Sequence, residues 1–130
     1  MPVSQELINV IFKEMVNPPQ HKARIVAVSL LFKYLSYSAE KGGYHPVEIR
    51  LISRNDEWYF DYITDFGYMG TVYPELEKEI DISWSQQYVF LAHVGDLPVN
   101  AGRELFELWQ SNFIQYHAMN VYTITVLWES

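Results

Sequence analysis

The chain has 130 residues, 49% hydrophobic and 16% aromatic, enough for one buried core, and we expect a single domain over residues 1–130. Nine basic against 16 acidic residues give a formal charge of −7, which disfavours nucleic-acid binding, and the absence of cysteine excludes disulfides and thiolate chemistry. With no signal-peptide pattern and no run of the ~20 apolar residues that a membrane helix needs, we expect a cytoplasmic protein.

The first predicted element is a helix from about Ser4 to Val16. Its apolar residues recur at helical spacing on one face, and they are Leu7, Ile8, Ile11, Phe12 and Met15. Ser4 is suited to cap the amino end. Pro18 and Pro19 end the helix because proline cannot continue the hydrogen-bond ladder.

A strand and a hairpin are predicted next. Residues 23–35 are rich in β-branched and aromatic side chains, which indicates a strand buried on much of both faces. Residues 46–53 and 57–66 flank Asn55 and Asp56, so a two-residue turn should join them. The expected cross-strand pairs are Arg54 with Glu57, Arg50 with Asp61, Pro46 with Asp65, Val47 with Thr64, Ile49 with Tyr62, and Leu51 with Phe60.

The second half of the chain predicts two strands, a helix and a last strand. A helical turn over 76–79 should give way to a strand at Ile80, and residues 87–94 indicate another strand. Asn100 should cap a helix whose apolar stripe is Leu105, Leu108, Trp109, Asn112, Phe113 and Tyr116. Residues 121–128 alternate as a strand. This order predicts an α+β fold, an antiparallel β-sheet with the N-terminal and C-terminal helices packed on one face in two layers.

Three segments carry a family resemblance, and they are YSAEKGGYHPVEIR, YFDYITDFGY and ELFELWQSNFIQYHAMNVYTITV. Together they resemble the bacterial family Domain of Unknown Function 2787, over nearly the whole chain. The resemblance implies a small bacterial protein of one domain, of a kind found in marine and related bacteria and on mobile gene cassettes. It implies no activity that can be transferred to this chain.

The loop 36–45 is the first candidate site. Gly42 and Gly43 permit backbone dihedrals that are closed to other residues, so the chain can turn sharply there or let a partner approach. The loop then delivers Tyr44 and His45 to the start of the hairpin.

His45 should lie beside Asp65 in the expected register. A histidine next to a carboxylate can act as a general base or bind a ligand, and Ser38 and Glu40 offer further polar atoms. The alternative is a purely structural loop, in which Ser38 and Glu40 satisfy backbone groups while His45 ties the loop to Asp65.

The polar face of the hairpin is the second candidate, with Glu48, Arg50, Asp61 and Asp65. The last two carboxylates should lie about 13 Å apart at ~3.3 Å per residue, too far for a shared proton. An exposed cross-strand ion pair between Arg50 and Asp61 is the simpler interpretation, worth at most ~1 kcal/mol.

Aromatic residues gather around the loop and hairpin, and they are Tyr34, Tyr37, Tyr44, Tyr59, Tyr68 and Tyr73. Such rings favour interfaces and ligand pockets because they bury area at low entropic cost. The polar hairpin face should also carry Ile52, Tyr59 and Ile63, which makes it too apolar for open solvent. We therefore expect a homo-oligomer, with a dimer favoured, in which a second copy covers this face.

Metal and cofactor chemistry finds little support in the sequence. The histidines at positions 21, 45, 93 and 117 have no H-x-x-x-H or related spacing, and no G-x-S-x-G motif is present. Gly42 and Gly43 lead into a strand, whereas a phosphate-binding turn leads into a helix. We expect no metal and no cofactor.

The favoured function is a small-molecule or protein binding module that uses the loop 36–45 and the hairpin 46–66. The candidate ligand-binding residues are Ser38, Glu40, Tyr44, His45, Arg50, Asp61 and Asp65. The alternative is an enzyme acting on a small polar metabolite, with His45 as general base oriented by Asp65 or Glu40. Arg50 would then hold a substrate anion. A third possibility, a structural or inhibitory partner of another protein, predicts a flat aromatic face with no cavity behind it.

Overall fold

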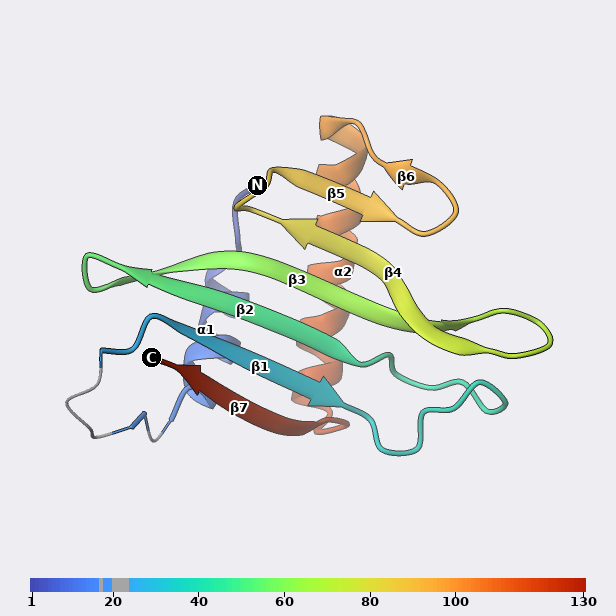
Figure 1. The fold of residues 1–130 in the computed structure, drawn as a ribbon, viewed down its shortest axis with the longest axis horizontal. Coiled ribbons are helices and arrows are strands. Elements are labelled where there is room, and N and C mark those ends of the chain that lie inside the picture. Colours follow the sequence, from blue (N-terminus) through green and yellow to red (C-terminus); the bar gives the residue numbers. More distant parts are fainter. Residues whose placement is uncertain (17, 20–23) are drawn as a thin grey trace.

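The computed structural model describes residues 1–16, 18–19 and 24–130. Within these residues the elements are, in chain order, α1 (Gln5–Glu14), β1 (Ala27–Lys33), β2 (Val47–Arg54), β3 (Glu57–Met69), β4 (Glu75–Ser83), β5 (Tyr88–Leu91), β6 (Gly95–Asp96), α2 (Val99–Ala118) and β7 (Thr123–Glu129). The strands form one sheet in the order β6-β5-β4-β3-β2-β1-β7, with every neighbouring pair antiparallel (Figure 1). The α+β class is confirmed.

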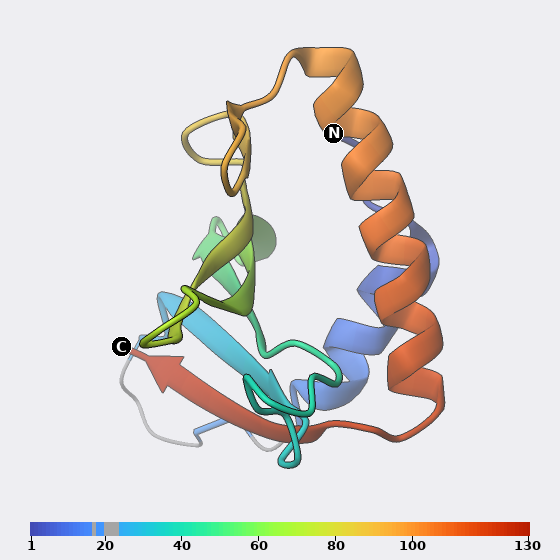
Figure 2. The same cartoon turned by 90° about the vertical axis from the view of Figure 1, so that its right-hand side faces the viewer.

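Both helices lie on the same side of the sheet in Figure 2. The hydrophobic cluster contains buried side chains from α1, α2 and five strands, so one core lies between helices and sheet. Phe32 of β1 meets Phe113 of α2 edge-on, with ring centroids 5.0 Å apart, and Trp109 stacks on Phe113 at 4.9 Å. Aromatic pairs at such separations add to the stability that burial provides.

The N-terminal helix is tied to α2 at its first turn. The predicted cap is confirmed, because Ser4 Oγ accepts a hydrogen bond from the Leu7 amide at 3.1 Å. The Ser4 amide in turn donates to Oε1 of the buried Gln110 at 2.9 Å. The helix ends at Glu14, two residues before the predicted end. Ala23, the predicted start of the first strand, lies outside the described residues, and β1 itself begins only at Ala27.

The predicted turn at Asn55 and Asp56 is confirmed, because both residues have positive φ (52° and 65°), as a type I′ turn requires. The pairs nearest the turn, Arg54 with Glu57 and Leu51 with Phe60, are also as predicted. The remaining pairs are wrong by one residue, because a β-bulge interrupts β3. The observed pairs are Arg50 with Tyr62, Ile49 with Ile63, Glu48 with Thr64, and Val47 with Asp65.

Asp61 is the extra residue in this bulge. Its backbone carbonyl accepts hydrogen bonds from the amides of Trp84 and Ser85, in the turn that follows β4. The bulge rotates the rest of β3, so Ile63 lies in the core with 1% of its surface exposed. Its predicted place on the polar face is therefore wrong. The homo-oligomer predicted to cover that face stays a prediction.

A second bulge lies in β4, where Asp65 pairs with Ile80 but Phe66 pairs with Lys78. Glu79 is the extra residue in this bulge. It interrupts the alternation of apolar and polar residues, and that interruption led to the predicted helical turn over 76–79. That prediction is wrong, because the 13-residue β3 offers pairing partners along the whole of β4.

The start of the second helix differs from the prediction as well. Helix α2 starts at Val99 after Pro98, and no side chain makes a capping hydrogen bond there, so Asn100 is not the cap. The predicted alternation of the last strand is confirmed, since Ile124, Val126 and Trp128 of β7 pack against the core, as does Tyr122 just before the strand.

Candidate functional site

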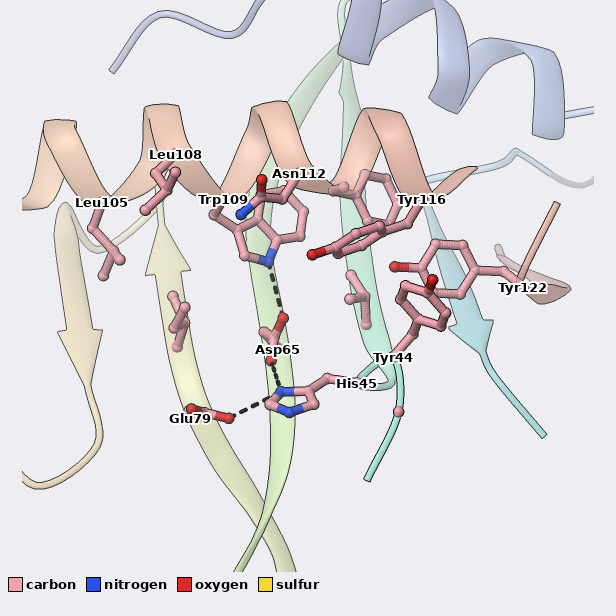
Figure 3. A pocket seen from close by; sticks show the side chains of 14 residues that line it. Tyr44, His45, Asp65, Glu79, Leu105, Leu108, Trp109, Asn112, Tyr116 and Tyr122 are labelled. Atoms are coloured by element: carbon pink, nitrogen blue, oxygen red, sulfur yellow. Dashed lines mark hydrogen bonds and ion pairs between the residues drawn. The ribbon is translucent and has the colours of Figure 1, made fainter. Parts of the chain in front are cut away.

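A cavity of about 560 Å³ lies between α2 and the sheet, next to the loop that leads into β2 (Figure 3). The stripe predicted for α2 forms one wall, and every member lines the cavity: Leu105, Leu108, Trp109, Asn112, Phe113 and Tyr116. Tyr44 and Tyr122 stand at one end. This volume is in the range of pockets that hold small-molecule ligands.

Three ionisable side chains meet on the sheet side of the cavity. His45 Nδ1 lies 2.8 Å from Asp65 Oδ1 and 2.9 Å from Glu79 Oε2. Trp109 Nε1 donates a hydrogen bond to the other Asp65 oxygen at 3.0 Å. Figure 3 shows Nδ1 directed at both carboxylates, while the second ring nitrogen is directed away from α2. The cluster thus joins the loop, two strands and the helix.

Local sequence explains how these groups converge. Asp65 alternates with the buried Ile63 on the helix side of β3, and His45 ends the loop just before β2. The bulge in β4 brings Glu79 to the cavity beside Ile80, whereas regular alternation would send neighbours to opposite faces. Gly67 leaves room for Glu79, because a β-carbon at Gly67 would collide with the Glu79 carboxylate.

The two carboxylates control the charge of His45. The hydrogen bond with Asp65 is the largest influence and raises the pKa of His45, while partial burial opposes it. The negative charges of Asp65 and Glu79 raise the pKa further. The imidazole therefore stays protonated to a higher pH than a free histidine, and its Nδ1–H donates to Asp65 while the charged ring forms an ion pair with Glu79.

The loop 36–45 supports His45 from outside the cavity. The ring of Tyr37 packs against the His45 ring at 5.2 Å, and its hydroxyl accepts a hydrogen bond from the Tyr68 amide at 3.1 Å. Ser38 holds the loop together, since its Oγ accepts from the Lys41 amide at 3.0 Å. Ser38 does not line the cavity, and neither does the exposed Glu40.

Three of the four hairpin candidates, Glu48, Arg50 and Asp61, lie on the other face of the sheet. Asp65 was predicted to share that face, but the bulge at Asp61 turns it to the cavity side. Arg50 Nη1 donates to Asp61 at 2.5 Å, and its Nε and Nη2 donate to the two carboxylate oxygens of Glu129 at 3.0 and 3.1 Å. The hydrogen bonds from Arg50 lower the pKa of Glu129. Of the seven predicted ligand-binding residues, the cavity takes only Tyr44, His45 and Asp65.

Sequence reasoning missed Glu79 and did not connect the α2 stripe with the site. Glu79 was assigned to a helical turn. In the structure it lies in β4 and contacts His45, which belongs to the loop before β2. The break in alternation over 75–83 is the one signal in the sequence that could have indicated a bulge.

The chain belongs to the family described as protein of unknown function (DUF2787), which matches residues 4–127. The solved structure of the hypothetical protein VC0508 from the VSP-II pathogenicity island of Vibrio cholerae is similar, with 34% identity and a TM-score of 0.91 over 99% of this chain and 94% of that one.

A second solved structure is that of VC1805 from pathogenicity island VPI-2 of Vibrio cholerae O1 biovar eltor. It has 36% identity and a TM-score of 0.78, over 97% of this chain and 95% of the other. That protein is described as sharing structural homology with the human P32 protein. No curated protein matches the chain significantly. Among the described residues, neither helix has the length and apolar character needed to cross a membrane.

Proposed function

We propose that this protein binds a small molecule in the cavity between α2 and the sheet. The observation that carries the proposal is the convergence of His45, Asp65 and Glu79 on a cavity of about 560 Å³ with aromatic walls. Ligand sites typically combine such an apolar lining with a few polar groups that orient the ligand.

The lining suggests how a ligand would lie. Leu105, Leu108 and Tyr116 offer an apolar surface along α2, and the polar cluster lies across the cavity from it (Figure 3). A ligand with an apolar or aromatic body and one polar end would match both sides. A partner protein recognised by a flat aromatic face fits less well, because a cavity lies behind these rings.

Catalysis with His45 as general base uses the same contacts and is the weaker candidate. Its Nδ1 is engaged with two carboxylates, and Figure 3 shows the other ring nitrogen directed away from α2. The raised pKa also keeps the imidazole protonated to a higher pH than in a free histidine, and the protonated form cannot accept a proton.

The test is thermal unfolding against a panel of metabolites, comparing two leucine variants. Leu108→Arg places a charge at the rim of the cavity, on a residue that is 61% exposed and therefore outside the core. Leu127→Arg makes the same change on β7, where the leucine is 51% exposed and outside the cavity. A ligand at ~100 times its Kd adds ~2.7 kcal/mol, which raises the midpoint by several degrees.

We expect a ligand that stabilises the wild type and Leu127→Arg to lose its effect in Leu108→Arg. Equal stabilisation of both variants would place the ligand elsewhere and contradict the proposal.

A further inference from the structure

The cluster on the sheet side of the cavity has the composition of a metal site. It offers one imidazole nitrogen from His45 and one carboxylate oxygen each from Asp65 and Glu79, and these three atoms lie within 4.8 Å of one another. We infer that His45, Asp65 and Glu79 bind a divalent first-row transition-metal ion. The inference departs from the sequence expectation of no metal, which considered only histidine spacing.

The distances require a small adjustment. Ligand atoms around a tetrahedral zinc ion at ~2.0 to 2.2 Å are separated by roughly 3.3 to 3.6 Å. In the structure Nδ1 lies 2.8 and 2.9 Å from the two oxygens, as expected when a shared proton occupies the position of the ion. The side chains of His45 and Glu79 are 33% and 39% exposed, so they can move apart by about 0.5 Å without disturbing the core.

The surroundings orient the ligands. Trp109 Nε1 holds one oxygen of Asp65 and leaves the other, Oδ1, for the ion. The Tyr37 ring packs against the imidazole, and the missing side chain at Gly67 accommodates the Glu79 carboxylate. Outer contacts of this kind fix the orientation of metal ligands.

Three protein ligands leave at least one coordination position for water or a bound molecule. All three residues line the cavity, so an ion held by them would be accessible from it. The metal site does not depend on the proposed small-molecule function, because the ion can bind with water in the open position.

The donor atoms favour particular ions. An imidazole nitrogen with two carboxylates suits Zn²⁺, Co²⁺ or Mn²⁺, whereas Mg²⁺ and Ca²⁺ prefer oxygen ligands alone. Within the first group the Irving–Williams order predicts tighter binding of Zn²⁺ and Co²⁺ than of Mn²⁺.

The experiment is calorimetric titration of the chelator-treated protein with Zn²⁺ and with Mg²⁺, together with the visible absorption of bound Co²⁺. We compare His45→Ala and Glu79→Gln with Glu40→Gln, which neutralises an exposed glutamate of the neighbouring loop outside the cavity. We expect one Zn²⁺ per wild-type chain, a Co²⁺ absorption band, and at least ~10-fold weaker binding of Mg²⁺.

Glu40→Gln should bind Zn²⁺ like the wild type. His45→Ala and Glu79→Gln should each weaken it by ~10-fold or more, as removal of a ligand costs at least what removal of an outer contact does. Absence of Zn²⁺ binding to the wild type would overturn the inference. Unchanged affinity in Glu79→Gln would also overturn it, and this half-buried position outside the core keeps the test valid should His45→Ala fail to fold.

Discussion

At the scale of single residues, two glycines have opposite surroundings within one loop. Gly43 has φ of +125°, and a β-carbon there would lie 2.8 Å from the ring of Tyr34. Tyr34 in turn packs edge-on against Tyr44, which contacts Tyr116 of α2 with ring centroids 4.7 Å apart. Gly42 also has positive φ, but nothing lies within 4 Å of its added β-carbon. Gly43 therefore determines the position of the tyrosines at one end of the cavity.

Gly43→Ala and Gly42→Ala form a matched pair. Both substitutions strain a left-handed backbone, which costs roughly 1 kcal/mol, but only the first also displaces the Tyr34 ring. We expect Gly43→Ala to lower the free energy of unfolding by about 2 to 3 kcal/mol and Gly42→Ala by about 1 kcal/mol. Urea unfolding measures both, and an equal loss in the two variants would contradict the role given to Gly43.

At the scale of elements, the outer face of the sheet is joined across strands by hydrogen bonds to carboxylates. Thr64 of β3 and Tyr88 of β5 both donate to the buried Asp81 of β4, at 2.6 and 2.5 Å. The bond to Asp81 is the main cause that raises the pKa of Tyr88 to about 12. The short strand β5 is thus anchored by a phenol that must keep its proton.

This anchor predicts a loss of stability at alkaline pH. The folded-state pKa of Tyr88 lies above the ordinary value of ~10, so its contribution is complete below pH ~10 and disappears as the pH rises through about 12. After discounting for solvent screening we expect a loss of about 1 kcal/mol over this interval. Urea unfolding of Tyr88→Phe and wild type at several pH values measures it.

The difference in unfolding free energy between wild type and Tyr88→Phe should shrink toward high pH. Tyr73→Phe is the control, because Tyr73 is 85% exposed and should behave like the wild type throughout. If the difference in unfolding free energy between wild type and Tyr88→Phe stayed constant from pH 9 to 12, the phenol proton would not contribute to stability, which contradicts the prediction.

At the scale of the whole molecule, local sequence patterns predicted the turn and the helix stripe, whereas long-range contacts determined the strand register. The turn at Asn55 and Asp56 and the stripe on α2 depend on neighbouring residues, and both were predictable. The bulge at Asp61 depends on hydrogen bonds from Trp84 and Ser85, more than 20 positions away. A register derived from the hairpin alone could not include them.

The candidate site divides in the same way. The contact between His45 and Asp65 was predictable, because both lie within the loop and hairpin and the register error was one residue. Glu79 and Trp109 come from other elements, and only the folded sheet and helix bring them to the cavity. Arg50 and Asp61 were assigned to the site, although they do not line the cavity. The sequence predicts that they pair across the hairpin, but it does not show which face of the sheet the helices cover.

The most direct test of the account follows the indole N–H of Trp109 by two-dimensional ¹H–¹⁵N NMR during titration with a small-molecule library. This group lines the cavity and donates to Asp65, so it reports on both parts of the site. We expect molecules that bind to shift the Trp109 indole signal and to leave that of Trp128, outside the cavity, unchanged. Binding molecules that shift other signals but leave Trp109 unchanged would contradict it.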